Sequence, residues 1–500
     1  MMFIPELLSK AAIEQPDKEA FRCKGQGLTY MEAEAAVDAV MGLLVAKGIG
    51  KGDRVGIFSS KCLDEIIALF AIMRIGAVFV HINPFFKEEQ LRHIAADCGI
   101  KLLFLHEGKT GTFLKAELAE SVPNVISLPL AEYKPGGKPG KIEPNPALED
   151  DPAAILYTSG STGRPKGIIV THRILYESTV VSAGLLGNHA GDRIISVTPF
   201  SFDGALSQLF TSVFAGATLI LQDSVFPKDI VGTLLTERIT GFHAVPSFWR
   251  MLLQRHSPFA GHHYPNLRYI SIIGEAFPHD EIKKLRSVLS KTRFYMMYGT
   301  TEAFRSTCLL PEDFDRKFPS AGKPLPGVEI EILNPEGEPC RPGEIGEITH
   351  QGAFVSPGYW NLPKLTAETF RNGRLYTGDL GWLDEEGFLY VEGRKDMMLK
   401  LMGIRVSPEE IEDGLCRMPG IQEVAAVGIT DTNGNVRIKA VIVREEGASL
   451  EAQDVILHCK RNLPHYMIPY EVEFCDSLPK TATLKINRSL LREPAGGMSL

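Results

Sequence analysis

Hydrophobic residues follow two alternating patterns along most of the chain before Pro324. Short β-branched and aliphatic runs predict strands, and longer segments with apolar residues at helical spacing predict helices between them. The runs are Arg54–Phe58, Val78–His81, Leu102–Leu105, Ala153–Tyr157, Ile194–Val197, Thr218–Leu221, Gly241–Val245 and Tyr269–Ile273. The alternation predicts parallel sheets covered by helices on both faces, and its length indicates two such sheets.

Two apolar segments could be mistaken for targeting or membrane elements. The N-terminal segment has its apolar residues at helical spacing, which predicts an amphipathic helix instead of a signal peptide. These residues are Ile4, Leu7, Leu8 and Ala11. The longest apolar region, Ile66 to Ile82, is interrupted by Arg74 and Gly76. It therefore predicts a buried helix that leads into a buried strand, and no membrane span.

After Pro324 the pattern changes to short strands separated by turn sequences. The predicted strands are Val328–Leu333, Gly346–His350 and Gly387–Val391. The predicted fold class is α/β, with two doubly wound parallel-sheet subdomains and a small β-barrel-like subdomain in residues 1–395. A compact α+β C-terminal domain is predicted for residues 396–500, with the boundary at Asp396.

Composition narrows the classes of function. The net charge of -8 argues against a nucleic-acid partner. None of the eight cysteines has CxxC spacing, so the sequence indicates neither a zinc site nor a dithiol redox centre. Their long spacings favour free thiols in a reducing compartment, and we predict a cytoplasmic protein.

One loop carries an unusual density of hydroxyls and glycines between two strands. Glycines let backbone N–H groups close around an anion, and hydroxyls and a lysine add donors and charge. The predicted phosphate-binding residues are Thr158, Ser159, Gly160, Ser161, Thr162, Gly163 and Lys166. The alternative is a flexible surface turn, and the loop lacks the Gly-Lys-Ser/Thr triplet of a Walker A loop.

The stretch from Tyr157 to Gly167 resembles the signature of the adenylate-forming superfamily. This superfamily includes acyl-CoA synthetases, amino-acid adenylation domains and firefly luciferase. Further motifs resemble the family in order and spacing. They are Leu28–Tyr30, Gly52–Val55, Gly274–Ala276, Tyr298–Glu302, Tyr376–Asp379, Gly393–Asp396 and Pro479–Thr481, which leads to Lys485.

The resemblance implies a two-step reaction that consumes ATP. A carboxylate attacks the α-phosphorus, and a thiol then displaces AMP from the acyl-AMP. Lys485, Thr158 and Glu302 are the catalytic residues by this resemblance, with Lys485 between the two reacting anions. Glu302 is the implied Mg²⁺ ligand. The alternatives are that Lys485 is a solvated surface lysine and that Glu302 is a surface or helix-capping acid.

The resemblance also implies the residues that bind the nucleotide. Tyr298 would offer a flat face to adenine, Asp379 would accept from the ribose hydroxyls, and Arg394 would contact ribose or phosphate. The full implied set adds Gly274, Glu275, Ala276, Gly299, Thr300 and Thr301. Core packing, a turn and a surface salt bridge are the alternatives for Tyr298, Asp379 and Arg394.

The C-terminal domain of the family changes orientation between the two steps. Asp396 matches the hinge, and Gly403 matches the position where a pantetheine arm approaches the backbone. The alternatives are that Asp396 is an ordinary exposed linker acid and that Gly403 is an ordinary turn glycine. The sequence departs from the family at Leu484, where a glycine usually precedes the catalytic lysine.

The acyl pocket should select the acid, and the resemblance does not identify which acid that is. The predicted pocket residues are Phe202, Asp203, Ser207, Val245 and Ile273. Asp203 could bind a substrate ammonium group, as in amino-acid adenylation domains, or could be a structural acid. Small and polar residues here favour a small or medium acyl group.

These features predict an AMP-forming acid–thiol ligase that uses ATP and Mg²⁺. The acyl acceptor would be coenzyme A or the phosphopantetheine of a separate carrier protein. One alternative is a free-standing amino-acid adenylation enzyme that loads a carrier protein. Another is a binding protein that keeps the fold without the activity.

Overall fold

The structure is a computed structural model of the 500-residue chain. It describes residues 3–86, 88–106, 122–128, 148–159, 165–274, 277–395, 399–401, 404–430, 436–463, 465–480 and 486–492. The chain divides into two compact units. The first comprises residues 1–275, 281–331 and 349–377, and the second comprises residues 276–280, 332–348 and 378–500. Asp396 lies outside the described residues, so the boundary between 395 and 396 stays a prediction.

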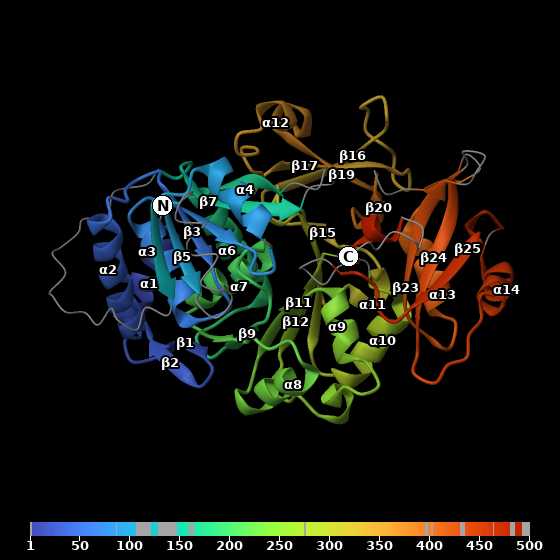
Figure 1. The fold of residues 1–500 in the computed structure, drawn as a ribbon, viewed down its shortest axis with the longest axis horizontal. Helices are drawn as coiled ribbons and strands as arrows, with labels where there is room; N and C mark the ends of the chain where they lie inside the picture. Colours follow the sequence, from blue (N-terminus) through green and yellow to red (C-terminus); the bar gives the residue numbers. More distant parts are fainter. Residues whose placement is uncertain are drawn as a thin grey trace. The chain divides into compact units, whose positions relative to one another are not determined.

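The first unit contains a nine-stranded sheet in which six neighbouring strands are parallel (Figure 1). In spatial order, the strands are β15 (Lys323–Pro324), β14 (Thr307–Leu309), β13 (Arg293–Tyr298), β12 (Tyr269–Ile273), β11 (Gly241–Ala244), β9 (Arg193–Ser196), β10 (Thr218–Leu221), β1 (Glu19–Cys23) and β2 (Gln26–Thr29). The edge strands β15, β14 and β2 pair antiparallel. The predicted parallel sheet is confirmed, with antiparallel edges that the pattern did not indicate.

A second sheet of the first unit has six strands. In spatial order, they are β6 (Asn124–Leu128), β5 (Leu102–His106), β3 (Arg54–Phe58), β4 (Val78–Ile82), β7 (Pro152–Ser159) and β8 (Pro165–Thr171). Only the β7–β8 pair is antiparallel. The two predicted parallel sheets are therefore both present.

One hydrophobic core joins helices to both sheets. The helices that contribute to it are α1 (Ile4–Glu14), α2 (Tyr30–Ala46), α3 (Leu63–Arg74), α6 (His172–Leu186) and α7 (Asp203–Phe214). The four apolar residues predicted to form one face of the first helix are all buried in α1. The segment from Ile66 to Ile82 runs through α3 into β4, as predicted.

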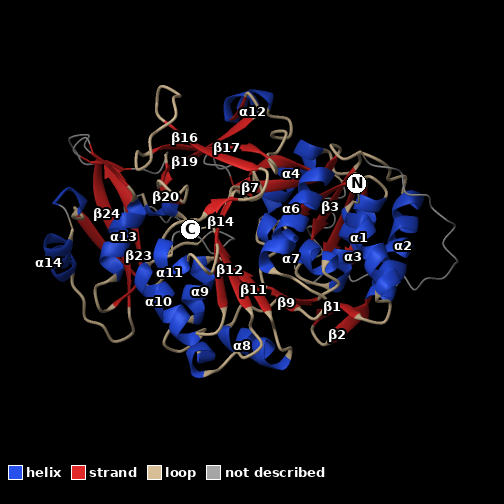
Figure 2. Cartoon of the chain, turned by 180° about the vertical axis from the view of Figure 1, so that it is seen from behind, coloured by secondary structure: helices blue, strands red, loops and turns tan. Residues whose placement is uncertain are grey.

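The outer faces of the two sheets carry their own helices. Helix α4 (Glu88–Cys98) packs against β4 and β5 in a separate core. The rings of Phe242 on β11, Trp249 on α9 (Pro246–Leu252) and Phe259 on a 3₁₀ helix, Pro258–Gly261, pack together. Figure 2 shows α9 among the helices beside this sheet. The other α-helices that the structure describes before residue 370 are α8 (Pro227–Thr236), α10 (His279–Val288), α11 (Phe314–Lys317) and α12 (Pro363–Thr369).

A third, smaller sheet has five strands. They are β16 (Val328–Leu333), β17 (Gly346–Gly352), β19 (Arg374–Leu383), β18 (Phe370–Arg371) and β20 (Leu389–Arg394), which pairs with β19. It is the small β subdomain that the sequence predicts. The longest strand, β19, was not predicted, and β20 begins two residues later than predicted.

The remainder of the second unit is α+β, as predicted. Its elements are the hairpin β21 (Leu399–Leu401) and β22 (Ile404–Val406), the sheet β23 (Ile421–Thr430), β24 (Val436–Arg444) and β25 (Glu471–Cys475), and the helices α13 (Pro408–Cys416) and α14 (Ala452–Asn462). Arg488 lies in a 3₁₀ helix, Arg488–Leu491, and its Nη2 donates to Glu412 Oε1 at 3.0 Å and Oε2 at 2.8 Å. This pair anchors the end of the chain to α13.

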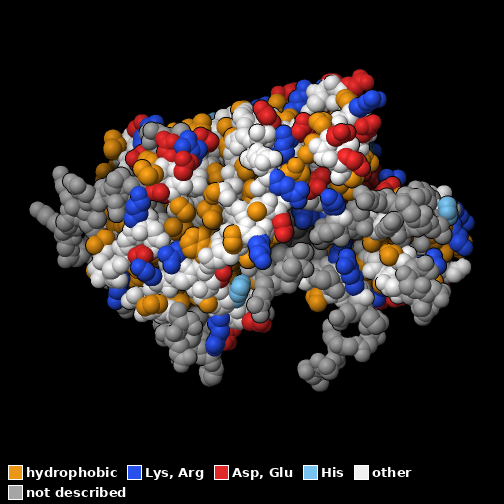
Figure 3. All heavy atoms as spheres, turned by 90° about the horizontal axis from the view of Figure 1, so that it is seen from above, with side chains coloured by type: hydrophobic (Ala, Val, Ile, Leu, Met, Phe, Trp, Pro, Cys, Tyr) orange, Lys and Arg blue, Asp and Glu red, His pale blue; other side chains and the backbone are white. Residues whose placement is uncertain are grey.

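Two general expectations can be compared with the fold. All eight cysteines are free thiols, as predicted. Across the part of the chain that the structure describes, no helix is long and apolar enough to cross a membrane. On the face drawn in Figure 3, acidic and basic side chains are interspersed.

Candidate active site

The two strands that flank the predicted phosphate-binding glycines, β7 and β8, pair as a β-hairpin. Strand β7 continues to Ser159 and β8 begins at Pro165, so the strands extend into the segment that was predicted to be loop. Thr158 lies directly opposite Lys166 in the hairpin register. Residues on opposite strands of an antiparallel pair share one face, so these two side chains project from the same face. Lys166 therefore lies on a strand, and Gly160 to Gly163 lie outside the described residues.

Lys166 takes part in a three-residue cluster with Glu302 and Tyr359. Its Nζ lies 3.2 Å from Glu302 Oε1 and donates to the Tyr359 hydroxyl at 2.9 Å. That hydroxyl donates in turn to Glu302 Oε1 at 2.8 Å. The ammonium also lies 4.2 Å from the centre of the Tyr359 ring, which adds a cation–π contact.

Backbone hydrogen bonds hold the segment that carries Tyr359 between the hairpin and the Glu302 turn. Ser356 N donates to Glu302 O at 2.8 Å, and Trp360 N donates to Gly167 O at 2.8 Å. The cluster therefore joins three segments that are far apart in the sequence: the β7–β8 hairpin, the turn after β13, and residues 356–360.

The charge of Glu302 is maintained by this cluster. Burial opposes ionisation of the carboxyl group, but the Lys166 ammonium and the Tyr359 hydroxyl outweigh it, and the pKa of Glu302 lies below its usual value. The side chains of Glu302 and Lys166 are 16% and 25% exposed, so a ligand can reach both.

An ionised carboxylate is a fitting ligand for Mg²⁺, which prefers oxygen. Within the described ranges, no three His, Cys, Asp or Glu residues gather into a metal site. A Mg²⁺ ion held by Glu302 would therefore take its other ligands from phosphate oxygens or water. Such an ion would neutralise phosphate charge.

The adenine-contacting residues predicted from the motifs follow adjacent parallel strands. Gly274 follows β12 and has a φ of 104°, a backbone conformation that favours glycine. Tyr298 is the last residue of β13, which is parallel to β12. Ligands of open α/β sheets bind at the carboxyl ends of such strands. Glu275 and Ala276 lie outside the described residues.

The turn after β13 is tightly packed. A Cβ on Gly299 would lie 2.9 Å from Arg305 Cα, so the backbone needs glycine there. Thr300 Oγ1 is buried and has no hydrogen-bond partner among the described atoms, whereas Thr301 is half-buried. Phe304 has a φ of 54°, a costly conformation for a bulky residue. It lies between Glu302 and Arg305 in the sequence.

Asp379 and Arg394 pair within the second unit. They are opposite each other in the β19–β20 register, and Arg394 Nη1 donates to Asp379 Oδ1 at 3.3 Å. Gly378 precedes Asp379 with a φ of 73°. Three predicted residues lie outside the described ranges, namely Lys485, Asp396 and Gly403.

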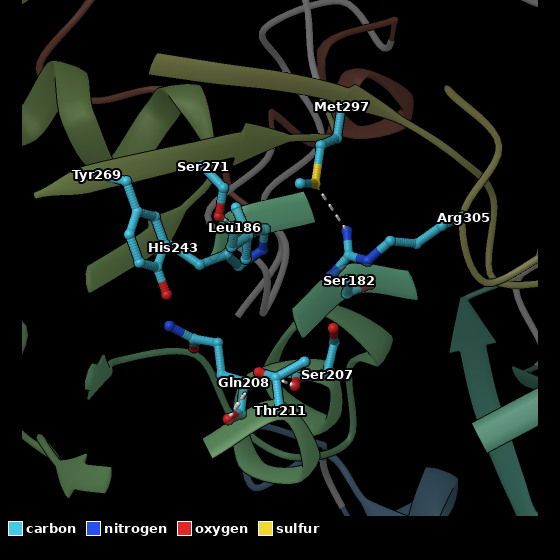
Figure 4. Close-up of a pocket in the computed structure, with 10 residues that line it drawn as sticks. All are labelled: Ser182, Leu186, Ser207, Gln208, Thr211, His243, Tyr269, Ser271, Met297 and Arg305. Carbon is cyan, nitrogen blue, oxygen red and sulfur yellow. Dashed lines mark hydrogen bonds between the residues drawn. The ribbon is translucent and has the colours of Figure 1, made fainter. Parts of the chain in front are cut away.

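A narrow cavity in the first unit lies beside the turn that carries Glu302. It is lined by Ser182, Leu186, Ser207, Gln208, Thr211, His243, Tyr269, Ser271, Met297 and Arg305 (Figure 4). Of the five predicted pocket residues, Ser207 belongs to this lining. Phe202 is the N-cap of α7 and Asp203 is its first residue, while Val245 is the N-cap of α9. Ile273 ends β12 and is almost fully buried.

Sequence reasoning assigned no role to Arg305 or Tyr359. Arg305 is 4% exposed, and its Nη1 lies 3.4 Å from Met297 Sδ. Its position three residues after Glu302 was a signal that could have drawn attention to it. Tyr359 could not be distinguished from a core aromatic, because its contacts come from segments remote in sequence.

Comparisons with known proteins place these features in one family. The family model of the AMP-binding enzymes matches residues 8–360, and that of the AMP-binding enzyme C-terminal domain matches residues 410–485. The chain is 31% identical to 3-hydroxybenzoate–CoA ligase of Aromatoleum, over 95% of this chain and 93% of that protein. It is 33% identical to L-proline–[L-prolyl-carrier protein] ligase of Streptomyces coelicolor, over 90% and 89%.

A solved structure shares the fold across the whole chain. It is O-succinylbenzoate coenzyme A synthetase (MenE) from Bacillus subtilis, in complex with ATP and magnesium ion. The TM-score is 0.88 at 29% sequence identity, and the match covers 97% of this chain and 99% of that one.

Proposed function

The chain belongs to the AMP-binding enzymes of the adenylate-forming superfamily and is an ATP-dependent adenylate-forming ligase, and from this premise we propose its substrates and its residue roles. The proposed substrate is a small or medium carboxylic acid, activated as acyl-AMP. The proposed acceptor is the thiol of coenzyme A or of a phosphopantetheine arm.

The cluster of Lys166, Glu302 and Tyr359 is the observation that carries the assignment of the phosphate site. In the first step, a carboxylate oxygen of the substrate bonds to the α-phosphorus, and the bond to the bridging oxygen breaks, so pyrophosphate leaves. Lys166 would neutralise charge on the leaving phosphates, and Glu302 would hold Mg²⁺ there. In the structure, the Lys166 ammonium lies beside the Glu302 carboxylate, and this contact helps to keep Glu302 ionised.

The other nucleotide roles are proposed from the matching motifs. Thr158 and the hairpin residues would donate to phosphate oxygens, Tyr298 would contact adenine, and Asp379 and Arg394 would bind ribose. The hydrogen bond from Arg394 to Asp379 keeps the two side chains together in the second unit, which supports a shared role in binding ribose. Lys485 would bridge the carboxylate and the α-phosphate in the first step.

The second step requires a thiol at the same acyl group. The sulfur bonds to the acyl carbon, the bond to the phosphate oxygen breaks, AMP leaves, and the thiol proton passes to solvent. We propose that residues 396–500 turn about Asp396 between the steps. The hairpin β21–β22 would then present Gly403 to the pantetheine arm.

A free-standing amino-acid adenylation enzyme is the second candidate. The similarity to the L-proline–carrier protein ligase, over most of both chains, favours keeping it. It requires Asp203 to bind an ammonium group. Against it, Asp203 interacts electrostatically with the buried guanidinium of Arg305, so that carboxylate already has a cation near it.

ATP–pyrophosphate exchange across fatty, aryl, dicarboxylic and amino acids tests the function. Exchange with at least one acid is expected, followed by thioester formation when coenzyme A or a phosphopantetheinylated carrier protein is added. If only amino acids support exchange and Asp203→Ala abolishes it, the result supports the amino-acid adenylation enzyme. No exchange with any acid contradicts the proposal.

Lys485→Ala tests the proposed division between the two steps. We expect loss of acyl-AMP formation, while thioester formation from supplied acyl-AMP is largely retained. Lys480→Ala is the matched control, since Lys480 belongs to the same motif but binds Glu423 at 2.8 Å. Equal loss of both steps in Lys485→Ala would contradict two orientations of the C-terminal domain.

A further inference from the structure

The cavity beside the Glu302 turn is polar and carries one formal charge. Among its lining residues, Arg305 is the only acid or base that is charged at neutral pH. His243 is neutral, because burial and the nearby Arg305 lower its pKa to about 3. Its Nδ1 shares a hydrogen bond with Ser271 Oγ at 2.9 Å, which fixes the ring.

The guanidinium of Arg305 is not fully used by the protein. Its Nε is buried and has no hydrogen-bond partner among the described atoms, and its Nη1 donates to the thioether sulfur of Met297 at 3.4 Å, a weak acceptor. Figure 4 shows the guanidinium group directed into the cavity, with the dashed contact to Met297 beside it. Burial lowers the pKa of Arg305, while the carboxylate of Asp203 opposes this effect.

Leaving a buried donor without a partner is costly, because the donor loses its water and gains nothing. The cost is larger for a charged group. Almost all buried polar groups of native proteins are hydrogen-bonded, so a donor without a protein partner is expected to be satisfied by a water, an ion or a ligand. The cavity has room for about one water-sized group, so the end of a substrate would enter it only when lining side chains move apart.

We propose that Arg305 selects acids that carry a second carboxylate at the end of the acyl group remote from the activated carboxyl. The proposal rests on the proposed function, since it names the substrate class of that ligase. In this role, Arg305 determines specificity, and its guanidinium binds the remote carboxylate while the first carboxylate reacts with ATP.

The lining favours a carboxylate over other end groups. A carboxylate accepts charge-assisted hydrogen bonds from a guanidinium, and these are stronger than bonds to a neutral oxygen. The hydroxyl of Ser207 on α7 can add a donor on the same wall. An ammonium group would meet the positive charge of Arg305, and a methyl group would leave the buried guanidinium unpaired.

The first test compares acids of equal length by ATP–pyrophosphate exchange. The pairs are succinate with butyrate, glutarate with pentanoate, and adipate with hexanoate, and 4-hydroxybutyrate is added to the first. A site built around a buried polar group rejects analogues that lack the partner. We expect the best dicarboxylate to exceed its monocarboxylate about 100-fold or more in kcat/KM.

Equal or better use of the monocarboxylates overturns the inference while leaving the ligase function intact. A preference for 4-hydroxybutyrate over succinate and its longer homologues also overturns it. If no acid supports exchange, the proposed function itself fails. Dicarboxylate binding is then tested separately, by its effect on the thermal midpoint of the ligand-free enzyme.

Arg305→Met links the preference to this side chain. We expect it to reverse the preference within each pair, with kcat/KM for the dicarboxylate reduced about 100-fold. Arg250→Met is the control, since Arg250 on α9 forms an ion pair with Glu281 outside the cavity lining and should leave the preference unchanged. An unchanged preference in Arg305→Met contradicts the assignment.

A variant that folds more readily covers the case in which Arg305→Met does not fold. Ser207→Ala removes one hydroxyl from the same wall, and it should weaken the dicarboxylate preference about 10-fold without raising KM for ATP. A dicarboxylate should also raise the thermal midpoint of the wild-type enzyme more than its monocarboxylate does. The same rise with both acids would contradict the proposal.

Discussion

Glu302 and Arg305 are three residues apart in one turn, yet their charged groups differ in burial and in hydrogen-bond partners. Glu302 is partly exposed, contacts Lys166 and accepts from Tyr359, and these partners lower its pKa. Arg305 is buried, its Nε has no hydrogen-bond partner among the described atoms, and its Nη1 donates to the Met297 sulfur at 3.4 Å. Glu302 therefore has a cation and a hydroxyl as direct partners, whereas the Arg305 guanidinium, although Asp203 interacts with it electrostatically, keeps a donor without a partner among the described atoms.

The backbone of the turn explains how neighbours in sequence can face different sites. Phe304 has a φ of 54°, and Gly299 leaves no room for a Cβ against Arg305. Strained residues of this kind persist where the surrounding structure holds them, and they cluster at functional sites. The difference between the two regions suggests that one turn couples phosphate binding to substrate choice.

Among the variants that test this comparison, Glu302→Gln should have the largest effect on activity. It removes the charge that would hold Mg²⁺, and we expect a loss of about 10²- to 10³-fold in kcat for ATP–pyrophosphate exchange. Glu281→Gln is the matched control, because Glu281 is also a partly buried glutamate in an ion pair, with Arg250. A loss below about 3-fold would break the assignment.

Gly299→Ala should impair both the exchange activity that depends on Glu302 and the substrate preference that depends on Arg305. The new Cβ would lie 2.9 Å from Arg305 Cα, and overpacking of this kind costs about 1–3 kcal/mol. We expect exchange to fall about 10- to 100-fold, together with a weaker preference between the matched acids. Gly184→Ala in α6 should be neutral, because no atom lies within 4 Å of its added Cβ. Damage to only one property would show that the two regions are independent.

Tyr359→Phe should reveal the electrostatic support of Glu302. The hydroxyl that donates to Glu302 helps to keep its pKa low, so removing it raises that pKa. Glu302 is then protonated at higher pH as the pH falls, and the acid limb of the pH–rate profile moves to higher pH. We expect about a 10-fold loss in kcat on that limb.

Tyr264→Phe is the control for the loss of a hydroxyl, because the Tyr264 hydroxyl donates to Phe259 O away from the cluster. An acid limb that does not move in Tyr359→Phe would show that Lys166 alone supports the charge.

Arg305→Met and Lys166→Met should have small and opposite effects on stability. Replacing a buried charged group by an apolar side chain is often stabilising, and Arg305 Nε has no hydrogen-bond partner among the described atoms. Although Asp203 loses a nearby cation, we expect a net gain of about 1 kcal/mol for Arg305→Met. Lys166→Met removes the cation beside Glu302 and should cost about 1 kcal/mol. Thermal unfolding of both variants measures the difference. Equal destabilisation would contradict the contrast between paired and unpaired charges.

The sequence predicted the regular part of the fold well. Thr218–Leu221, Tyr269–Ile273 and Val328–Leu333 are strands with the predicted bounds. Hydrophobic period depends on local residue order, so it can be read without the tertiary structure. Strand β19 was missed because glycine and charged residues interrupt its apolar pattern, and it depends on pairing with β18 and β20.

The sequence by itself determined the superfamily, the two parallel sheets and the motif residues that include Thr158, Lys166, Glu302 and Asp379. These depend on residue type, spacing and local periodicity. Only the tertiary structure brought Tyr359 to Glu302 and showed an Arg305 nitrogen at a polar cavity that no described atom hydrogen-bonds. Hydrogen bonding and burial depend on segments that meet in space, and no local pattern records which donors remain without a partner.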